Sequence, residues 1–321
     1  MMKRFFQLAI LILCAVTFFN CKSSATSAEE YYSIGMAYFE LGKYDEAERW
    51  LNRAKHTNKT MVASKYNLGR LAFERQQYNE AAGYFEDILK QDPDNVLALR
   101  AAAYSRIKTG DFDTADKHYN KLLSLIPDSA DDGYNHALVL YAMDRYSDAE
   151  TVLEKYPLAL LENPEVQLLY ARSQSAQNKV EAIESYSSWL NSNTDAKVRY
   201  EYAKTLEQHE YYARAMEEYR KAMSETAAAD KDLNNEIHFA LAGLLLVADS
   251  ESDEGITELQ TAVKGGFGNI EAIEELLTKN EISSENRESL RKIIDDMRLS
   301  GQKKETETQE ESETDSQSDS Q

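Results

Sequence analysis

A repeat period of 34 residues is the feature that most constrains how this 321-residue chain can fold. Small residues recur at Ala47, Ala81, Ala115 and Ala149, each 34 positions after the one before. Three more columns keep this interval: an aromatic residue three positions before each alanine, a large apolar residue four positions after it, and a small residue twelve positions before it. In that order the columns are Tyr44, Tyr78, Phe112 and Tyr146; Leu51, Phe85, Tyr119 and Leu153; and Gly35, Gly69, Ala103 and Ala137. A constant period of this length indicates a stacked array of repeats.

Each period predicts a pair of helices. When the first repeat is numbered from Ala28, its columns at positions 4, 7, 8 and 11 lie on one face of an α-helix. Gly or Ala at position 8 and Ala at position 20 let the two helices approach closely, and the larger columns fill the volume around that contact. Only 4 prolines occur in the whole chain, which favours helices throughout. One such hairpin cannot bury its apolar face alone, so the sequence predicts an all-α fold of stacked hairpins.

These columns resemble the tetratricopeptide repeat, a 34-residue helix-turn-helix unit. The copy over 28–61 has the pattern most fully, with Tyr31, Ile34, Gly35, Tyr38, the run from Gly42 to Ala47, Leu51 and Ala54. The resemblance implies a right-handed α-solenoid with four regular repeats over 28–157 and degenerate repeats over 158–282. We place the degenerate copies near 165–195, 196–229 and 236–269, and we expect Pro157 to cut short the second helix of the fourth repeat.

The C-terminal part of the chain leaves this pattern. Residues 283–299 contain Leu290, Ile293, Ile294 and Met297 at helical spacing, which predicts an amphipathic helix that caps the array. Residues 300–321 include no apolar side chain and are rich in acids. We therefore expect a disordered acidic tail.

The N-terminus has the pattern of an export signal. Two basic residues precede a fifteen-residue apolar run from Phe5 to Phe19, which is short for a membrane span. The segment around Cys21 resembles a bacterial lipobox, although positions 18 and 20 depart from the usual leucine and small residue. The resemblance implies a signal peptide over 1–20, lipidation of Cys21 as the first mature residue, and a lipidated linker over 21–27. The alternatives are an uncleaved anchor and an incidental cysteine.

No residue pattern predicts an enzyme, a cofactor or a metal site. The two cysteines are Cys14 and Cys21, and the five histidines share no ligand spacing. Phosphate-loop and His-Glu-x-x-His motifs do not occur in the sequence. The acidic run over 249–255 lacks the glycine and glutamate of a calcium loop, so we expect an inter-helix turn there. The glycines over 265–268 follow a predicted helix, which favours a helix C-cap over a phosphate site.

Positions 2, 5, 9 and 12 of each first helix lie opposite the packing columns and are rich in aromatic residues. In tetratricopeptide proteins this face lines the concave surface that binds peptides, so the resemblance implies a partner-binding groove. The predicted partner-binding residues, with two asparagines at position 6, are Tyr32, Met36, Phe39, Tyr66, Asn67, Arg70, Phe73, Arg100, Tyr104, Tyr134, Asn135 and Tyr141. We call these residues, together with Ile107 and Leu138, the first-helix strip.

The first helices differ in charge along the array. Those over 62–75 and 96–109 contain six basic residues and one acid, whereas those over 28–41 and 130–143 contain five acids and no Lys or Arg. A basic centre with Arg70 and Arg100 predicts an extended partner with an anionic group, such as a C-terminal carboxylate. The alternative is that the aromatic residues are ordinary for this fold and the charges are solvated.

A known carboxylate clamp is not carried over to this chain. Some chaperone-binding members of the family hold a partner's terminal carboxylate with Lys, Asn and Arg. Here Tyr32, Ser33, Leu97 and Ala101 occupy clamp positions. The sequence therefore does not predict a chaperone as the partner.

Taken together, these features predict an interaction scaffold of the bacterial cell envelope, lipid-anchored on the periplasmic side or at the cell surface. It would hold a protein or peptide partner and help to assemble an envelope complex. A formal net charge of −20 excludes a typical nucleic-acid binder. The alternatives are a transport accessory that binds a small ligand in a closed apolar cavity, and a homo-oligomer built through the degenerate half. An enzyme has the least support, because no constellation suits acid-base or nucleophilic catalysis.

Overall fold

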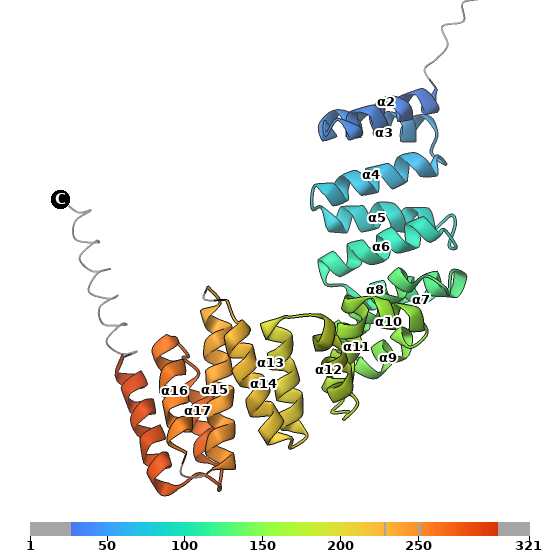
Figure 1. Ribbon diagram of the computed structural model, residues 1–321. Coiled ribbons are helices and arrows are strands. Elements are labelled where there is room, and N and C mark those ends of the chain that lie inside the picture. The colour runs from blue at the N-terminus through green and yellow to red at the C-terminus, as the bar shows by residue number, and fades with distance from the viewer. Residues whose placement is uncertain (1–26, 228, 250–251, 301–321) are drawn as a thin grey trace, which may run out of the picture. The chain divides into compact units, whose positions relative to one another are not determined.

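The computed structural model of the chain describes residues 27–227, 229–249 and 252–300 (Figure 1). Within these residues all regular secondary structure is helical. The predicted signal peptide, Cys21, nearly all of the linker and the tail over 301–321 lie outside the described residues. The described part separates into two compact units, and the division after Arg145 falls within the fourth repeat.

The first unit contains three complete hairpins and the first helix of a fourth. Its helices are α2 (Ala28–Glu40), α3 (Tyr44–Thr57), α4 (Val62–Glu74), α5 (Tyr78–Leu89), α6 (Val96–Thr109), α7 (Phe112–Leu125) and α8 (Ala130–Ala142). Each helix packs against the next one along the chain. Ser27 begins α2 with a capping box, in which its hydroxyl accepts from the Glu30 amide and the Glu30 carboxylate accepts from the Ser27 amide. The predicted hairpins of this half are confirmed.

The second unit contains the remaining helices. These are α9 (Tyr146–Leu153), α10 (Pro157–Glu162), α11 (Pro164–Ala176), α12 (Ala182–Ser192), α13 (Ala196–Gln208), α14 (Tyr212–Glu225), α15 (Lys231–Ala248), α16 (Asp253–Gly265) and α17 (Ile270–Leu277), followed by a helix over 284–300. Three pairs of helices pack as hairpins in this unit: α11 with α12, α13 with α14, and α15 with α16. The degenerate region is therefore built from the same helical hairpin as the regular repeats.

Pro157 does more than end a helix. It is the first residue of α10, a six-residue helix between the short α9 and α11. A proline at the first helical position loses no hydrogen bond, because that amide has no partner within the helix. Pro164 begins α11 in the same way. The sequence predicts the early end of α9 but not the extra helix.

The C-terminal helix covers the apolar end of the second unit. Ser283 caps its start, with the hydroxyl accepting from the Asn286 amide at 3.2 Å. Leu290, Ile293 and Ile294 are buried against residues of α15, α16 and α17. This contact confirms the predicted cap on the array.

The hairpins close around residues with little or no side chain. A Cβ atom on Gly35 would lie 2.8 Å from Cγ of Leu51, and one on Gly69 would lie 2.7 Å from a ring carbon of Phe85. The alanine column at 47, 81, 115 and 149 is 0% exposed throughout. The small columns therefore set the distance between the two helices of a repeat.

A second, polar pattern links successive repeats. An acid at position 21, on the second helix, pairs with a basic residue near the inter-helix turn of the next repeat: Glu48 with Arg75 at 2.7 Å, Asp116 with Arg145 at 2.8 Å, and Glu150 with Lys179 at 2.6 Å. Glu150 is buried, and hydrogen bonds from Lys179, Gln177 and Gln174 hold its pKa below the usual range although burial acts to raise it. These acids are therefore joints between repeats and not simply solvated charges.

Two further turns match their sequence interpretation. Gly266 has a φ of 119° and caps α16, and its amide donates to the carbonyl groups of Ala262 and Val263. This confirms a helix C-cap. The acidic run lies between the end of α15 and the start of α16, where Ser252 caps the helix. Residues 250 and 251 of this run lie outside the described residues.

Replacing Gly69 with alanine should lower the free energy of unfolding by about 1–3 kcal/mol, because the added methyl group overlaps the Phe85 ring. Gly83 on α5 is the matched control, since a Cβ atom there meets nothing within 4 Å. Gly83→Ala should instead raise stability by up to about 1 kcal/mol through helix propensity. Urea denaturation followed by circular dichroism measures both. Equal shifts for the two variants would contradict the close-approach account.

Candidate partner-binding surface

The first helices α2, α4, α6 and α8 carry the first-helix strip, and the structure uses much of it to join neighbouring repeats. Between the first and second repeats, Asn67 Nδ2 donates to Tyr32 Oη at 3.1 Å and to the Ala63 carbonyl at 3.0 Å. Its Oδ1 accepts from Arg70 Nη1 at 3.0 Å. Asn67 is only 5% exposed. We therefore correct its predicted role: it orients Tyr32 and Arg70 and is not available to a partner.

Arg70 is held in place but keeps its charge. Its guanidinium group lies 4.9 Å from the centroid of the Phe39 ring, with the Asn67 hydrogen bond fixing its other side. The residue is exposed, and no carboxylate within the described ranges lies at ion-pair distance from it. Stacking on an aromatic face positions the guanidinium without neutralising it. Arg70 therefore remains a candidate anion-binding group.

Met36 and Tyr66 face the interior more than the surface. Met36 packs with Tyr32 and Phe39 on the core cluster around Ala47 and Leu51. The Tyr66 ring lies 5.3 Å from that of Phe85 on the paired helix. Both are half-buried, so they contribute an edge to the surface and most of their area to the core.

An aromatic stack joins the second and third repeats. The rings of Phe73 and Tyr104 are stacked with centroids 5.4 Å apart, and Phe73 also meets Tyr78 edge-on at 5.0 Å. Tyr104 is 42% exposed, and Lys108 Nζ lies 5.3 Å from its ring. Tyr104 therefore stays partly exposed, with Phe73 stacked on its ring and a cation over it.

Arg100 is not the free cation that the sequence predicts. It forms a two-fold ion pair with Asp132 of the fourth repeat, at 2.7 Å from Nε and 2.6 Å from Nη2. Only 2% of the Asp132 side chain is exposed, and Ser129 Oγ donates to it at 2.6 Å. Burial acts to raise the Asp132 pKa, but the hydrogen bonds from Arg100 and Ser129 prevail and hold it below its usual range.

Two other arginines counted in the basic centre are paired as well. Arg75 pairs with Glu48, and Arg106 pairs with Glu86 at 2.7 Å. The expected cationic centre is therefore smaller than the sequence count suggests, because the opposing acids lie on the neighbouring repeats. Among the arginines of the first-helix strip, Arg70 has no carboxylate partner in the described ranges.

The fourth repeat contributes mainly apolar surface. Asn135 donates to the Asp131 carbonyl of its own helix at 2.9 Å, which turns its amide back onto α8. Tyr134 and Tyr141 are half-buried, whereas Leu138 is 38% exposed. The sequence interpretation missed Leu97, which is 55% exposed at position 2 of α6 and could have been found from that strip position.

No group of three or more His, Cys, Asp or Glu side chains in the described ranges is arranged to hold a metal ion. Among the helices that the structure describes, none has the length and apolarity needed to cross a bilayer.

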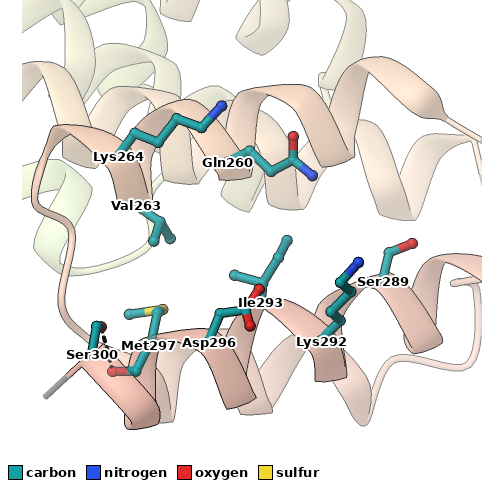
Figure 2. A pocket seen from close by; sticks show the side chains of 9 residues that line it. All are labelled: Gln260, Val263, Lys264, Ser289, Lys292, Ile293, Asp296, Met297 and Ser300. Atoms are coloured by element: carbon teal, nitrogen blue, oxygen red, sulfur yellow. Dashed lines mark hydrogen bonds between the residues drawn. The ribbon is translucent and has the colours of Figure 1, made fainter. Parts of the chain in front are cut away.

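A pocket of about 560 Å³ lies in the second unit between α16 and the helix over 284–300 (Figure 2). Figure 2 shows Val263 and Ile293 at its apolar centre, with Lys264, Lys292 and Asp296 among the side chains around them. Six of its nine lining residues are polar or charged. The pocket therefore differs from the closed apolar cavity that the small-ligand alternative predicts.

Three family models named for the tetratricopeptide repeat match residues 28–59, 66–130 and 106–173. The chain is a tetratricopeptide-repeat protein. The matches cover the regular repeats and reach residue 173 in α11, and the paired helices that follow, up to α16, continue the same architecture.

Two curated proteins illustrate the range of relatives of this tetratricopeptide-repeat protein. An uncharacterised lipoprotein of Treponema pallidum (strain Nichols) is 26% identical over 152 residues, which cover 47% of this chain and 78% of that protein. The protein O-mannosyl-transferase Tmtc3 of Drosophila melanogaster is 24% identical over 125 residues, 39% of this chain. That match covers only 14% of the transferase.

Solved structures show the same fold. A tetratricopeptide repeat protein from Parabacteroides merdae has a TM-score of 0.52 at 21% identity, covering 78% of this chain and 97% of that one. YrrB, described as a tetratricopeptide protein with an unusual peptide-binding site, has a TM-score of 0.51 at 17% identity, covering 58% and 96%. At these identities the likeness concerns the fold alone.

The variant Asp132→Asn tests whether the Arg100 pair is a structural joint. Because the folded pKa of Asp132 is depressed, its stabilising contribution is fully present above the unfolded pKa of about 4 and is lost as pH falls through the folded value. Since Arg100 is 44% exposed, we expect a loss of only about 1–2 kcal/mol at pH 7. The difference from wild type should shrink below about pH 4.

Urea denaturation at neutral pH and at about pH 3 measures this prediction. The exposed neighbour Asp131 provides the control, and Asp131→Asn should change stability by less than about 0.5 kcal/mol. An Asp132→Asn deficit that stays constant between the two pH values would contradict the role of the charge.

Proposed function

We propose that this protein is a lipid-anchored interaction scaffold of the bacterial cell envelope, and that its first-helix strip holds an extended segment of a partner protein. Tetratricopeptide repeats form protein-interaction scaffolds, and the present array has that architecture. The observation that carries the proposal is the set of exposed apolar side chains on α6 and α8 together with Arg70 on α4, which has no carboxylate partner among the described residues.

The apolar part of this face is Leu97, Tyr104 and Leu138, which are 55%, 42% and 38% exposed. They occupy positions 2, 9 and 9 of the adjacent first helices α6 and α8, on the face that the packing columns leave free, where Leu97 adds to the first-helix strip. Scattered exposed apolar residues are ordinary on a surface, but several on one face indicate an interaction site. Apolar side chains of an extended segment would bury this area.

The polar part is Arg70. Its guanidinium is fixed by Phe39 and Asn67, so binding an anion there loses little side-chain entropy. Arg100 is engaged by Asp132 and is not part of this site. The proposed partner segment therefore places one carboxylate, from a side chain or a chain terminus, at Arg70.

The envelope location rests on the N-terminal sequence and on one relative. Cys21 follows a lipobox-like segment, and the relative in Treponema pallidum is named a lipoprotein. Two or more acyl chains on one residue hold a protein firmly to a bilayer, whereas a single chain binds only marginally. A scaffold tethered in this way would collect its partners at the membrane.

A photo-crosslinking amino acid at Tyr104 or Leu138 should form an adduct of the same size from either position in native membranes. The same amino acid at Tyr212, which is 37% exposed on α14, should not form that adduct. Adding Arg70→Glu should reduce the adduct at least about tenfold, because it replaces a charge-assisted hydrogen bond by repulsion.

Arg291→Glu on the C-terminal helix is the matched charge reversal and should leave the adduct unchanged. Helicity by circular dichroism should equal that of the parent in all variants. An adduct that also forms from position 212, or that survives Arg70→Glu, would reject the strip as the binding site.

The tether has its own test. Cys21→Ala should abolish metabolic incorporation of labelled fatty acid and move the protein from the membrane to the soluble fraction. Cys14→Ala lies inside the predicted signal and should change neither result. Unchanged labelling in Cys21→Ala would exclude lipidation at this residue.

A further inference from the structure

Trp50 of the first repeat occupies a position whose equivalents in the next two repeats pack against the preceding repeat. Trp50 is at position 23, and its equivalents 34 and 68 residues later are Tyr84 and His118. Tyr84 packs on the core cluster of the first repeat, below Lys55 at 5.1 Å, and His118 Nε2 lies 3.7 Å from Glu86 of the second repeat. In both cases the side chain faces the second helix of the repeat before it. Trp50 belongs to the first repeat, so no described helix occupies that place.

Trp50 lies next to one aromatic ring and one cation. The Tyr31 ring centroid lies 5.8 Å from that of Trp50, and the Arg53 guanidinium lies 4.5 Å from the Trp50 ring. Arg49, Arg53 and His56 are spaced by four and three residues, so they share one face of α3, and all three are exposed. We call Tyr31, Arg49, Trp50, Arg53 and His56 the Trp50 face.

The charge of this region is opposite to that of the whole protein. Residues 49–73 contain six Lys and Arg and no acid, in a chain with a formal net charge of −20. Within the Trp50 face, Arg49 lies 3.6 Å from the Glu46 carboxylate, which is itself 42% exposed. Arg49 Nε also donates to the Asp45 backbone carbonyl. The Asp45 and Glu48 carboxylates form ion pairs with Arg75 of the second repeat. Arg53 has no carboxylate at ion-pair distance among the described residues, so it gives the face its positive character.

The predicted lipid attachment point lies close by in sequence. Cys21 and Ser27 are six residues apart, which spans at most about 20 Å when fully extended. Tyr31 follows Ser27 by one helical turn, about 6 Å along the axis of α2, and contacts Trp50. A tether at Cys21 therefore keeps the Trp50 face within reach of the bilayer surface.

From these observations we infer that the Trp50 face docks on the anionic phospholipid headgroups of the membrane that holds the Cys21 anchor. This inference rests on the proposed tether. Arginine suits phosphate groups through its forked donors, and tryptophan is favoured at the boundary between headgroups and acyl chains. The rest of the acidic chain is repelled by the same surface, so docking through this face fixes which end of the first unit meets the membrane.

The test uses the mature chain over 21–321 with Trp189→Phe, so that Trp50 is the only tryptophan, because the chain contains 2. Its single cysteine, Cys21, is coupled to a maleimide lipid in phosphatidylcholine vesicles with or without phosphatidylglycerol. We expect the Trp50 emission to shift to the blue, and to be quenched by brominated phosphatidylcholine, only when phosphatidylglycerol is present. Because the coupling is chemical, the outcome does not depend on whether the cell acylates Cys21, which fatty-acid labelling tests separately.

The double variant Arg49→Glu and Arg53→Glu should lower the ratio of docked to undocked protein by at least about 30-fold. Lys117→Glu with Lys155→Glu makes the same charge change at exposed sites outside the face and should keep the quenching. Equal helicity of the variants shows that each is folded. Quenching that persists in the double arginine variant, or emission that never responds to phosphatidylglycerol, would overturn the inference. An emission change that follows protein concentration instead of lipid composition would also overturn it, in favour of a second copy covering Trp50.

Discussion

The close approach of the two helices in each repeat is the constraint on which the rest of the structure depends. Gly35 and Gly69 lie against Leu51 and Phe85 with no room for a further carbon, and the facing alanine column is fully buried. Once these columns fix the hairpin, the remaining faces of the first helices are determined. The same small residues that build the core therefore decide which side chains form the first-helix strip.

Polar contacts join several neighbouring repeats, and they limit which residues of the first-helix strip are open to a partner. Asn67 and Arg100 resemble binding residues in the sequence, yet each contacts a neighbouring repeat in the structure. Buried ion pairs add little net stability compared with apolar packing, but removing one partner is costly. Such contacts therefore favour one register of stacking. What remains for a partner is the exposed apolar row and the charge of Arg70.

The 34-residue period predicted the hairpins because small and large columns repeat at that interval, and a single strong pattern suffices to place each helix. It did not predict the pairing of Arg100, because Asp132 lies 32 residues away, at a different position of the next repeat and in no conserved column of the period. Nor did it predict α10, because a proline such as Pro157 is compatible both with the end of one helix and with the first position of another. The first-helix strip could be predicted from positions within the repeat. Whether each of its residues is free to contact a partner depends on side chains of neighbouring repeats, which no spacing rule identifies.

The ion pair between Arg100 and Asp132 has a practical consequence for dissecting this protein. A fragment that ends before Asp132 would retain the first three repeats and Arg100 but lose the carboxylate that neutralises it. On the first-helix strip such a fragment would present two arginines without a carboxylate partner, Arg70 and Arg100, where the described residues of the intact chain leave only Arg70 in that state. Affinities for acidic peptides measured on shortened forms would then exceed those of the whole protein, so the fourth repeat belongs in any minimal binding unit.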